Sequence, residues 1–299
     1  MSDEPLLDGP TLRQLERLRL RDLDAIISGL LGDDAAGTVS GGRGVEFADY
    51  RPYAPGDDLR RIDWNVYARL RQPFVRTSPR DSELGLALLL DGSRSMGDPG
   101  APGRRHAERL AALLGAIVLL RGGTAQLTVL ADGHAFSGEP LSGEQDVTEL
   151  LDQLERIPRG RGTDLAVGIA QRRPLEVAAE VGALLTDALI PLPALDEALT
   201  ALGALPAAVL LHVTEPAAAD GAAVGPIELV DAETGERLAL DVTPRSLAEH
   251  AQWLDAHAAA VAQHCRAHGI GYVRMDAGED AFAQVAALAD ARELVQRER

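Results

Sequence analysis

The chain has 299 residues, of which 46% are hydrophobic, and its formal net charge is -17. This length and hydrophobic content allow a substantial buried core, which excludes global disorder. The strong acidity argues against general affinity for nucleic acid or for anionic membranes. Its longest apolar run, residues 110–120, is well short of the roughly 18 residues that a membrane span requires.

Two further features bear on the cellular compartment. The N-terminus, MSDEPLLDGP, is acidic and polar, unlike a secretory signal. The single cysteine, Cys265, precludes an internal disulfide and suits a reducing environment. We therefore expect a cytoplasmic protein with no membrane span.

The first part of the chain differs in composition from the rest. Leucines at near-helical spacing predict a helix over residues 11–31, and the Gly-, Ser- and Asp-rich residues 32–44 predict a loop. Residues 45–80 form a distinct block that holds most of the aromatic residues and carries turn and strand signals. We expect residues 1–82 to be an N-terminal extension and residues 83–299 to form the main domain.

From residue 84 onward, strand and helix patterns alternate. The apolar run 84–90 is typical of a strand buried on both faces. Further strands are expected at 125–131, 134–141, 181–189, 207–213 and 271–275, with a hairpin at 227–242. Helices are expected at 104–120, 144–156, 164–173, 193–203 and 246–268, with Gly269 ending the last of these, and a final helix after residue 275. This alternation predicts an α/β, Rossmann-like, mainly parallel sheet with helices on both faces.

Polar residues follow two of the predicted buried strands. Asp91, Ser93 and Ser95 come directly after the strand 84–90, and Asp187 ends the apolar run of the strand 181–189. Thr163 stands in a Gly-rich turn ahead of a predicted helix. Because ligands of parallel sheets bind beyond the carboxyl ends of the strands, these residues are the candidate site.

One interpretation of this site is a serine hydrolase. Ser95 lies in a turn similar to a nucleophile elbow, and Ser95, Asp187 and His212 follow in the order of the hydrolase triad. Against it, Ser93 occupies an elbow position that favours glycine, and no helix follows the turn at once. His212 also lies inside an apolar strand, where histidine is usually a packing residue. This interpretation is the alternative.

The favoured interpretation is a site for a hard metal ion. Asp-x-Ser-x-Ser offers one carboxylate and two hydroxyls, and Mg²⁺ prefers oxygen ligands with few carboxylates. DGSRSM after an apolar strand, GTD before a helix and LLTDA after a later strand resemble the metal-ion-dependent adhesion site (MIDAS) of von Willebrand factor A domains. The resemblance implies that residues 83–299 have a von Willebrand factor A-type fold. It also implies that Ser93, Ser95 and Thr163 contact Mg²⁺ or Mn²⁺, with Asp91 and Asp187 acting partly through water.

The block before the first buried strand carries a second resemblance. GRGVEFADYRPYAPGDDLRRIDWNVYARLRQPFVR and the later ELVDAETGERLALDVTP resemble the bacterial family called domain of unknown function fifty-eight. Members often accompany MoxR-type AAA+ ATPases. The resemblance implies a non-enzymatic interaction module, an adaptor or co-chaperone, whose metal accepts an acidic side chain from a protein partner.

Two groups of residues leave alternatives open. Residues 41–80 hold eight arginines and five acidic residues. The arginines either form internal ion pairs with these acids or form a docking face together with Tyr50, Tyr53, Trp64 and Tyr67. Four histidines recur along the long helix: His250, His257, His264 and His268. They are either a polar flank of the helix or include a zinc site at the i, i+4 pair His264 and His268. Cys265 falls on the apolar stripe of this helix and is expected in the core.

Overall fold

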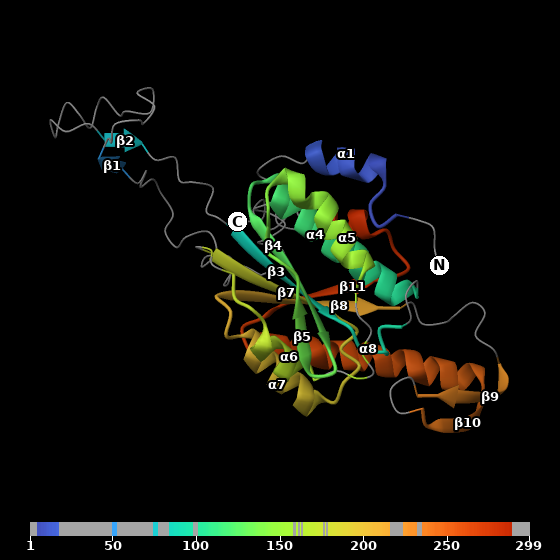
Figure 1. The fold of residues 1–299 in the computed structure, drawn as a ribbon. Helices are drawn as coiled ribbons and strands as arrows, with labels where there is room; N and C mark the ends of the chain where they lie inside the picture. The colour runs from blue at the N-terminus through green and yellow to red at the C-terminus, as the bar shows by residue number, and fades with distance from the viewer. Residues whose placement is uncertain are drawn as a thin grey trace, which may run out of the picture.

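The protein is built around a mixed sheet whose central strands are parallel (Figure 1). The computed structural model describes residues 5–17, 50–52, 74–76, 84–97, 101–157, 160, 162, 164–175, 177, 179–215, 224–231 and 235–288. The strand order is β11-β8-β7-β3-β4-β5, and β6 also pairs with β4. Strands β11, β8, β7, β3 and β4 are parallel, whereas β5 and β6 run antiparallel to β4.

Strands and helices largely alternate along the chain. The strands of the sheet are β3 (Leu84–Asp91), β4 (Thr124–Ala131), β5 (His134–Ser137), β6 (Leu141–Ser142), β7 (Ala179–Thr186), β8 (Ala207–Thr214) and β11 (Gly271–Asp276). The helices are α1 (Gly9–Arg17), α4 (Pro102–Leu120), α5 (Val147–Glu155), α6 (Leu165–Gln171), α7 (Leu192–Leu202) and α8 (Pro244–Ala267), and residues 281–288 are also helical. A 3-10 turn, η2 (Glu144–Asp146), precedes α5.

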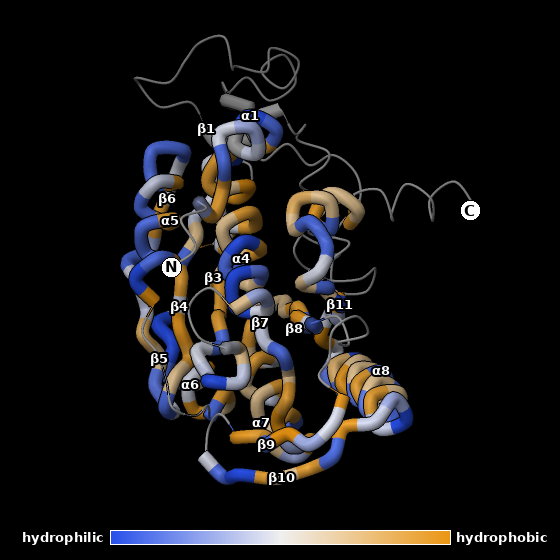
Figure 2. The backbone as a smooth tube through the Cα atoms, turned by 90° about the vertical axis from the view of Figure 1, so that its right-hand side faces the viewer, coloured by the Kyte–Doolittle hydropathy of each residue, from blue (hydrophilic) through white to orange (hydrophobic). Residues whose placement is uncertain are grey.

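Alternate side chains of β3 enter two separate cores. Leu86, Leu88 and Leu90 pack on the α4 side, in a cluster that also contains Leu15 of α1. Leu89 packs on the opposite side, in the cluster formed by α6, α7 and the C-terminal half of α8. In Figure 2, much of β3 and β4 has the orange colour of hydrophobic residues. A strand covered on both faces has no polar side, which explains the apolar run at 84–90.

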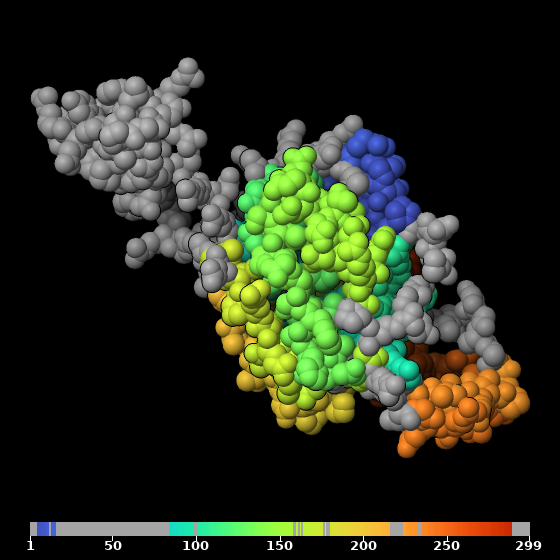
Figure 3. Space-filling model, in the orientation of Figure 1, coloured from blue at the N-terminus to red at the C-terminus, as the bar shows by residue number. Residues whose placement is uncertain are grey.

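A hairpin and the start of α8 extend beyond the sheet (Figures 1 and 3). Strands β9 (Gly225–Val230) and β10 (Arg237–Val242) pair only with each other among the described residues. Helix α8 begins with a capping box between Thr243 and Ser246, and Gly269, with φ +68°, follows its end. The buried residues of α8 all lie in its C-terminal half: Ala258, Val261 and Cys265.

Most of the predicted elements of the main domain are confirmed. The mainly parallel α/β sheet, the 227–242 hairpin and the long helix are present, and Asp132 and Gly133 form the β4–β5 turn with φ +51° and +69°. Of the predicted helix 11–31, the described part is α1. The division at residue 82 stays a prediction. No helix in the described ranges is long and apolar enough to cross a membrane.

The Arg- and aromatic-rich block is described only in part. Its strand signal is confirmed by β1 (Tyr50–Pro52), which pairs antiparallel with β2 (Phe74–Arg76). The rest of the block, with its proposed ion pairs and docking face, lies outside the described residues, as does the predicted loop 32–44.

The two-sided core leads to a stability prediction. Leu88 is fully buried, so Leu88→Ala is expected to lower the free energy of unfolding by about 2–5 kcal/mol. The same truncation at Leu238, which is 62% exposed on β10, should change it by less than about 0.5 kcal/mol. Urea denaturation followed by circular dichroism measures both. Equal losses in the two variants would contradict the assignment of the core.

Candidate functional site

The loop after β3 is held tightly against the end of β4. Gly92 donates its N–H to the carbonyl of Leu130 at 2.8 Å and accepts from the N–H of Gly160 at 3.1 Å. A Cβ on Gly92 would lie 3.0 Å from Val129 Cγ1 and 3.1 Å from the carbonyl oxygen of Leu130. The glycine of the DGSRS stretch therefore allows a close backbone approach that fixes the loop.

The carboxylate of Asp91 is buried and joins two strands. Its Oδ1 accepts the N–H of Ser93 at 2.9 Å, and its Oδ2 accepts the hydroxyl of Thr186 at 2.6 Å. Thr186, at the end of β7, accepts in turn from the N–H of Ala188 at 3.0 Å. A carboxylate removed from water needs such donors, so Asp91 organises the loop as well as offering an oxygen.

The two serine hydroxyls of the loop lie together. Ser93 Oγ and Ser95 Oγ are 2.9 Å apart, and Ser93 is buried while Ser95 is exposed. Asp187 is half-buried beside them: its N–H contacts Met96 Sδ at 3.1 Å, and its Oδ1 accepts the N–H of Leu189 at 3.0 Å. Four of the five predicted site residues thus come from one edge of the sheet.

The fifth predicted residue, Thr163, lies outside the described residues, but its neighbours approach the same edge. The N–H of Gly162 donates to Asp132 Oδ1 at 3.2 Å, and the N–H of Asp132 donates to the carbonyl of Gly162 at 2.9 Å. Asp164 caps α6 by accepting the N–H of Val167 at 3.1 Å. These bonds, with that of Gly160 to Gly92, bring the turn to the ends of β3 and β4.

His212 is part of a different network from the one that the hydrolase alternative requires. Its Nε2 lies 2.8 Å from the carbonyl oxygen of Asp187, and its Nδ1 lies 2.9 Å from the hydroxyl of Tyr272. Because Nε2 faces a carbonyl, it is the protonated nitrogen, and Nδ1 accepts from the phenol. Neither nitrogen is bonded to Ser95, and burial lowers the pKa of His212 to about 4. His212 is therefore a packing residue whose imidazole holds the backbone carbonyl of Asp187.

The donor set at the edge fits a hard cation. The side chains at the edge offer carboxylate and hydroxyl oxygens, which Mg²⁺ and Mn²⁺ accept. Within the described part of the chain, no group of three His, Cys, Asp or Glu side chains is arranged to hold a metal. An ion here would therefore depend on the hydroxyls of Ser93 and Ser95 and on water, with Asp91 and Asp187 supplying the negative charge.

A groove continues from this edge to α8. A cavity of about 620 Å³ is lined by Ser95 and Asp187 of the sheet edge and by Leu247, Ala251 and Leu254 of α8. Sequence reasoning missed this cavity because its walls come from segments far apart in the chain.

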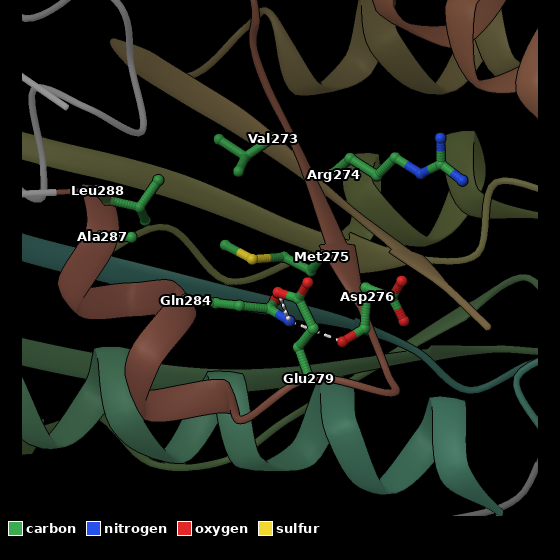
Figure 4. Close-up of a pocket in the computed structure, with 8 residues that line it drawn as sticks. All are labelled: Val273, Arg274, Met275, Asp276, Glu279, Gln284, Ala287 and Leu288. Carbon is green, nitrogen blue, oxygen red and sulfur yellow. Dashed lines mark hydrogen bonds between the residues drawn. The ribbon is translucent and has the colours of Figure 1, made fainter. Parts of the chain in front are cut away.

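A second, open cavity of about 360 Å³ lies between β11 and the helical residues 281–288 (Figure 4). There Gln284 Nε2 donates to the carbonyl of Asp276 at 2.7 Å and to Glu279 Oε2 at 3.3 Å. Gln284 thus joins Asp276 to Glu279, whereas Arg274, which also lines this cavity, donates to Asp255 and Thr214 outside its lining.

The histidines of α8 divide into two groups. His264 Nδ1 and His268 Nε2 both contact Asp196 Oδ1, at 2.6 and 3.2 Å, and so join α8 to α7. His250 and His257 instead stack against Trp253, with ring centroids 6.1 and 5.2 Å away. In the same helix Cys265 is buried, as expected, and burial raises the pKa of its thiol to about 12.

Fold and edge together define a class of protein. It is an α/β protein whose mainly parallel sheet gathers carboxylates and hydroxyls at its carboxyl edge. Residues 49–260 match the family described as "Protein of unknown function DUF58". The chain belongs to this DUF58 family.

Relatives and solved structures extend the comparison. The chain is 31% identical over 290 residues to Uncharacterized protein Mb1516 of Mycobacterium bovis and to Uncharacterized protein Rv1480 of Mycobacterium tuberculosis, over 95% of this chain and 89% of each relative. Among solved structures, BatB from Bacteroides thetaiotaomicron is 17% identical, with a TM-score of 0.41 over 71% of this chain and 99% of its own. An aerotolerance-related membrane protein from Bacteroides fragilis is 15% identical, with a TM-score of 0.40 over 69% and 97%.

The bond between Thr186 and Asp91 predicts a specific pattern of stability. Thr186→Val keeps the shape but removes the donor to a buried carboxylate, so the free energy of unfolding should fall by about 1–3 kcal/mol. Thr186→Ser keeps the hydroxyl and should lose clearly less. Urea denaturation of the two variants gives the comparison. A serine variant as unstable as the valine variant would show that the hydroxyl is not what matters.

The buried neutral His212 predicts a pH dependence of stability. The unfolded chain binds a proton near pH 6.5 that the folded chain accepts only near pH 4, so stability should decline as pH falls through this window. The decline attributable to His212 is on the order of 3 kcal/mol. His212→Gln should flatten the dependence of unfolding free energy on pH, whereas His250→Gln, at an exposed position, should not. An unchanged slope in His212→Gln would contradict the assignment.

Proposed function

We propose that this DUF58 protein is a non-enzymatic, divalent-metal-binding interaction module with a von Willebrand factor A-type fold, acting as adaptor or co-chaperone of a MoxR-type AAA+ ATPase. Asp91, Ser93, Ser95, Thr163 and Asp187 would hold Mg²⁺ or Mn²⁺ in a MIDAS-type site. The bound ion would supply an electrophilic centre for an acidic side chain of a protein partner.

The observation that carries this proposal is the pairing of the Ser93 and Ser95 hydroxyls beside a buried, hydrogen-bonded Asp91. Two neutral oxygens at one point of a fixed loop suit an ion that keeps most of its charge. A nucleophilic serine would instead need a base, and the imidazole of His212 is bonded to Asp187 and Tyr272. The chain's own residues therefore favour binding over hydrolysis.

Metal binding is tested by isothermal titration with MgCl2 and MnCl2. Ser95→Ala and Asp187→Asn are expected to weaken binding by about tenfold or more, because each removes an oxygen ligand or a charge. Asp241→Asn, on the exposed strand β10, removes the same charge away from the site and should leave binding unchanged. Binding that is equal in all four proteins would refute a metal at this edge.

The partnership is tested with the purified MoxR-type ATPase of the same organism. Immobilised wild-type protein should retain the ATPase in MgCl2 and release it in EDTA, and Ser95→Ala should retain little in either buffer. Retention that persists in EDTA would refute docking through the metal, and no retention in MgCl2 would refute this partner.

A further inference from the structure

The N-terminal half of α8 leaves an apolar face unpartnered. Leu247, Ala251 and Leu254 recur at helical spacing along the cavity, but none of them is buried. The buried residues of α8 begin only at Ala258. The first half of α8 therefore does not contribute this apolar face to the core, although a capping box stabilises the start of the helix.

The groove is also lined by the carboxyl edge of the sheet. Met96, Leu189 and Val213 line it, and Leu189 is 47% exposed. The volume of about 620 Å³ exceeds what a single carboxylate needs and is within the range of sites that bind several groups at once. Since Ser95 and Asp187 belong to the same lining, a molecule bound at the candidate metal would have its neighbouring atoms in this groove.

The charged groups along the walls are already bonded within the protein. Glu215 Oε1 accepts the N–H of Gly103 at 2.9 Å, at the start of α4, where Ala101 offers no side-chain cap. Arg274 donates to Asp255 at 3.0 Å and to Thr214 at 3.3 Å. The remainder of the lining thus favours apolar groups, and the place for an anionic group is the candidate metal site at Ser95 and Asp187.

Trp253 adds an ordered aromatic side chain next to the groove. It is 53% exposed and stacked at 11° against both His250 and His257, two residues that also line the cavity. His257 is fixed further because its Nε2 lies 2.8 Å from the carbonyl oxygen of Ala188. Exposed, ordered tryptophans are enriched among the residues that dominate protein interfaces.

We infer that this groove binds an extended segment of a protein partner in which one or more large apolar residues adjoin the acidic residue that reaches the metal edge. The inference rests on the proposed function and adds to it the sequence class of the partner. The acidic residue supplies the charge complementarity, and the apolar residues distinguish the correct segment from other acidic peptides.

The test uses a random dodecapeptide library displayed on phage, selected on the full chain in MgCl2. Peptides with Asp or Glu next to Leu, Ile, Met or Phe should be enriched. For a synthetic copy of an enriched peptide, measured by fluorescence anisotropy, Leu254→Arg should weaken binding by about tenfold or more. The Mg²⁺ affinity of the Leu254→Arg protein, measured by isothermal titration, should stay unchanged. Replacement of the peptide's apolar residue by serine should weaken binding by a similar factor.

Two controls separate the groove from the metal and from the fold. Leu238→Arg makes the same charge change on the exposed face of β10 and should leave peptide binding and thermal stability unchanged. Ser95→Ala should weaken both Mg²⁺ and peptide. No enrichment, enrichment without the apolar residue, or full binding to Leu254→Arg would overturn the inference. Binding that is sensitive to Leu254→Arg but indifferent to EDTA would support the groove and refute the metal-centred function.

Discussion

The hydrogen bond from Thr186 to Asp91 is the constraint on which the candidate site depends. Leu90 pairs with Leu185 in the parallel register of β3 and β7, so the next residues of the two strands, Asp91 and Thr186, meet at the edge of the sheet. A buried carboxylate without donors would be strongly unfavourable. Its second oxygen orders the loop through the N–H of Ser93, and the hydroxyls are thereby presented from a fixed backbone.

The rigidity of this edge originates in the two cores beneath it. Each parallel strand sends alternate side chains into the α4 cluster and into the α6–α7–α8 cluster, so no strand can slide without disturbing both. Because the strand ends are fixed, the loops that follow them begin at fixed positions. The oxygens of Asp91, Ser93 and Ser95 are consequently held in place by the fold itself, which under the proposed function would reduce the entropy lost on binding.

Sequence patterns predicted the mainly parallel α/β sheet and most of its carboxyl edge, and the reason lies in the topology. Apolar runs identify the strands of a covered parallel sheet, and their carboxyl ends lie at the same edge, so Asp91, Ser93, Ser95 and Asp187 could be grouped from their positions alone. Thr186 was missed because a threonine at the end of a strand has no distinctive signal, although it stands directly before Asp187. The bonds of His212 and the groove depend on β11 and α8, and no local pattern encodes such distant pairings.

The N-terminal half of α8 and the β9–β10 hairpin extend beyond the sheet, so the core and the exposed helix surface are built from different residues. Substitutions in the N-terminal half of α8 affect few core contacts, because the buried residues of the helix begin at Ala258. Substitution of Asp91 or Thr186 at the sheet edge, in contrast, removes a buried hydrogen bond and destabilises the fold. Under the proposed function, the choice of partner could therefore change through substitutions on the helix surface while the sheet edge stays the same, so that one scaffold would serve several partners in related proteins at little cost to folding.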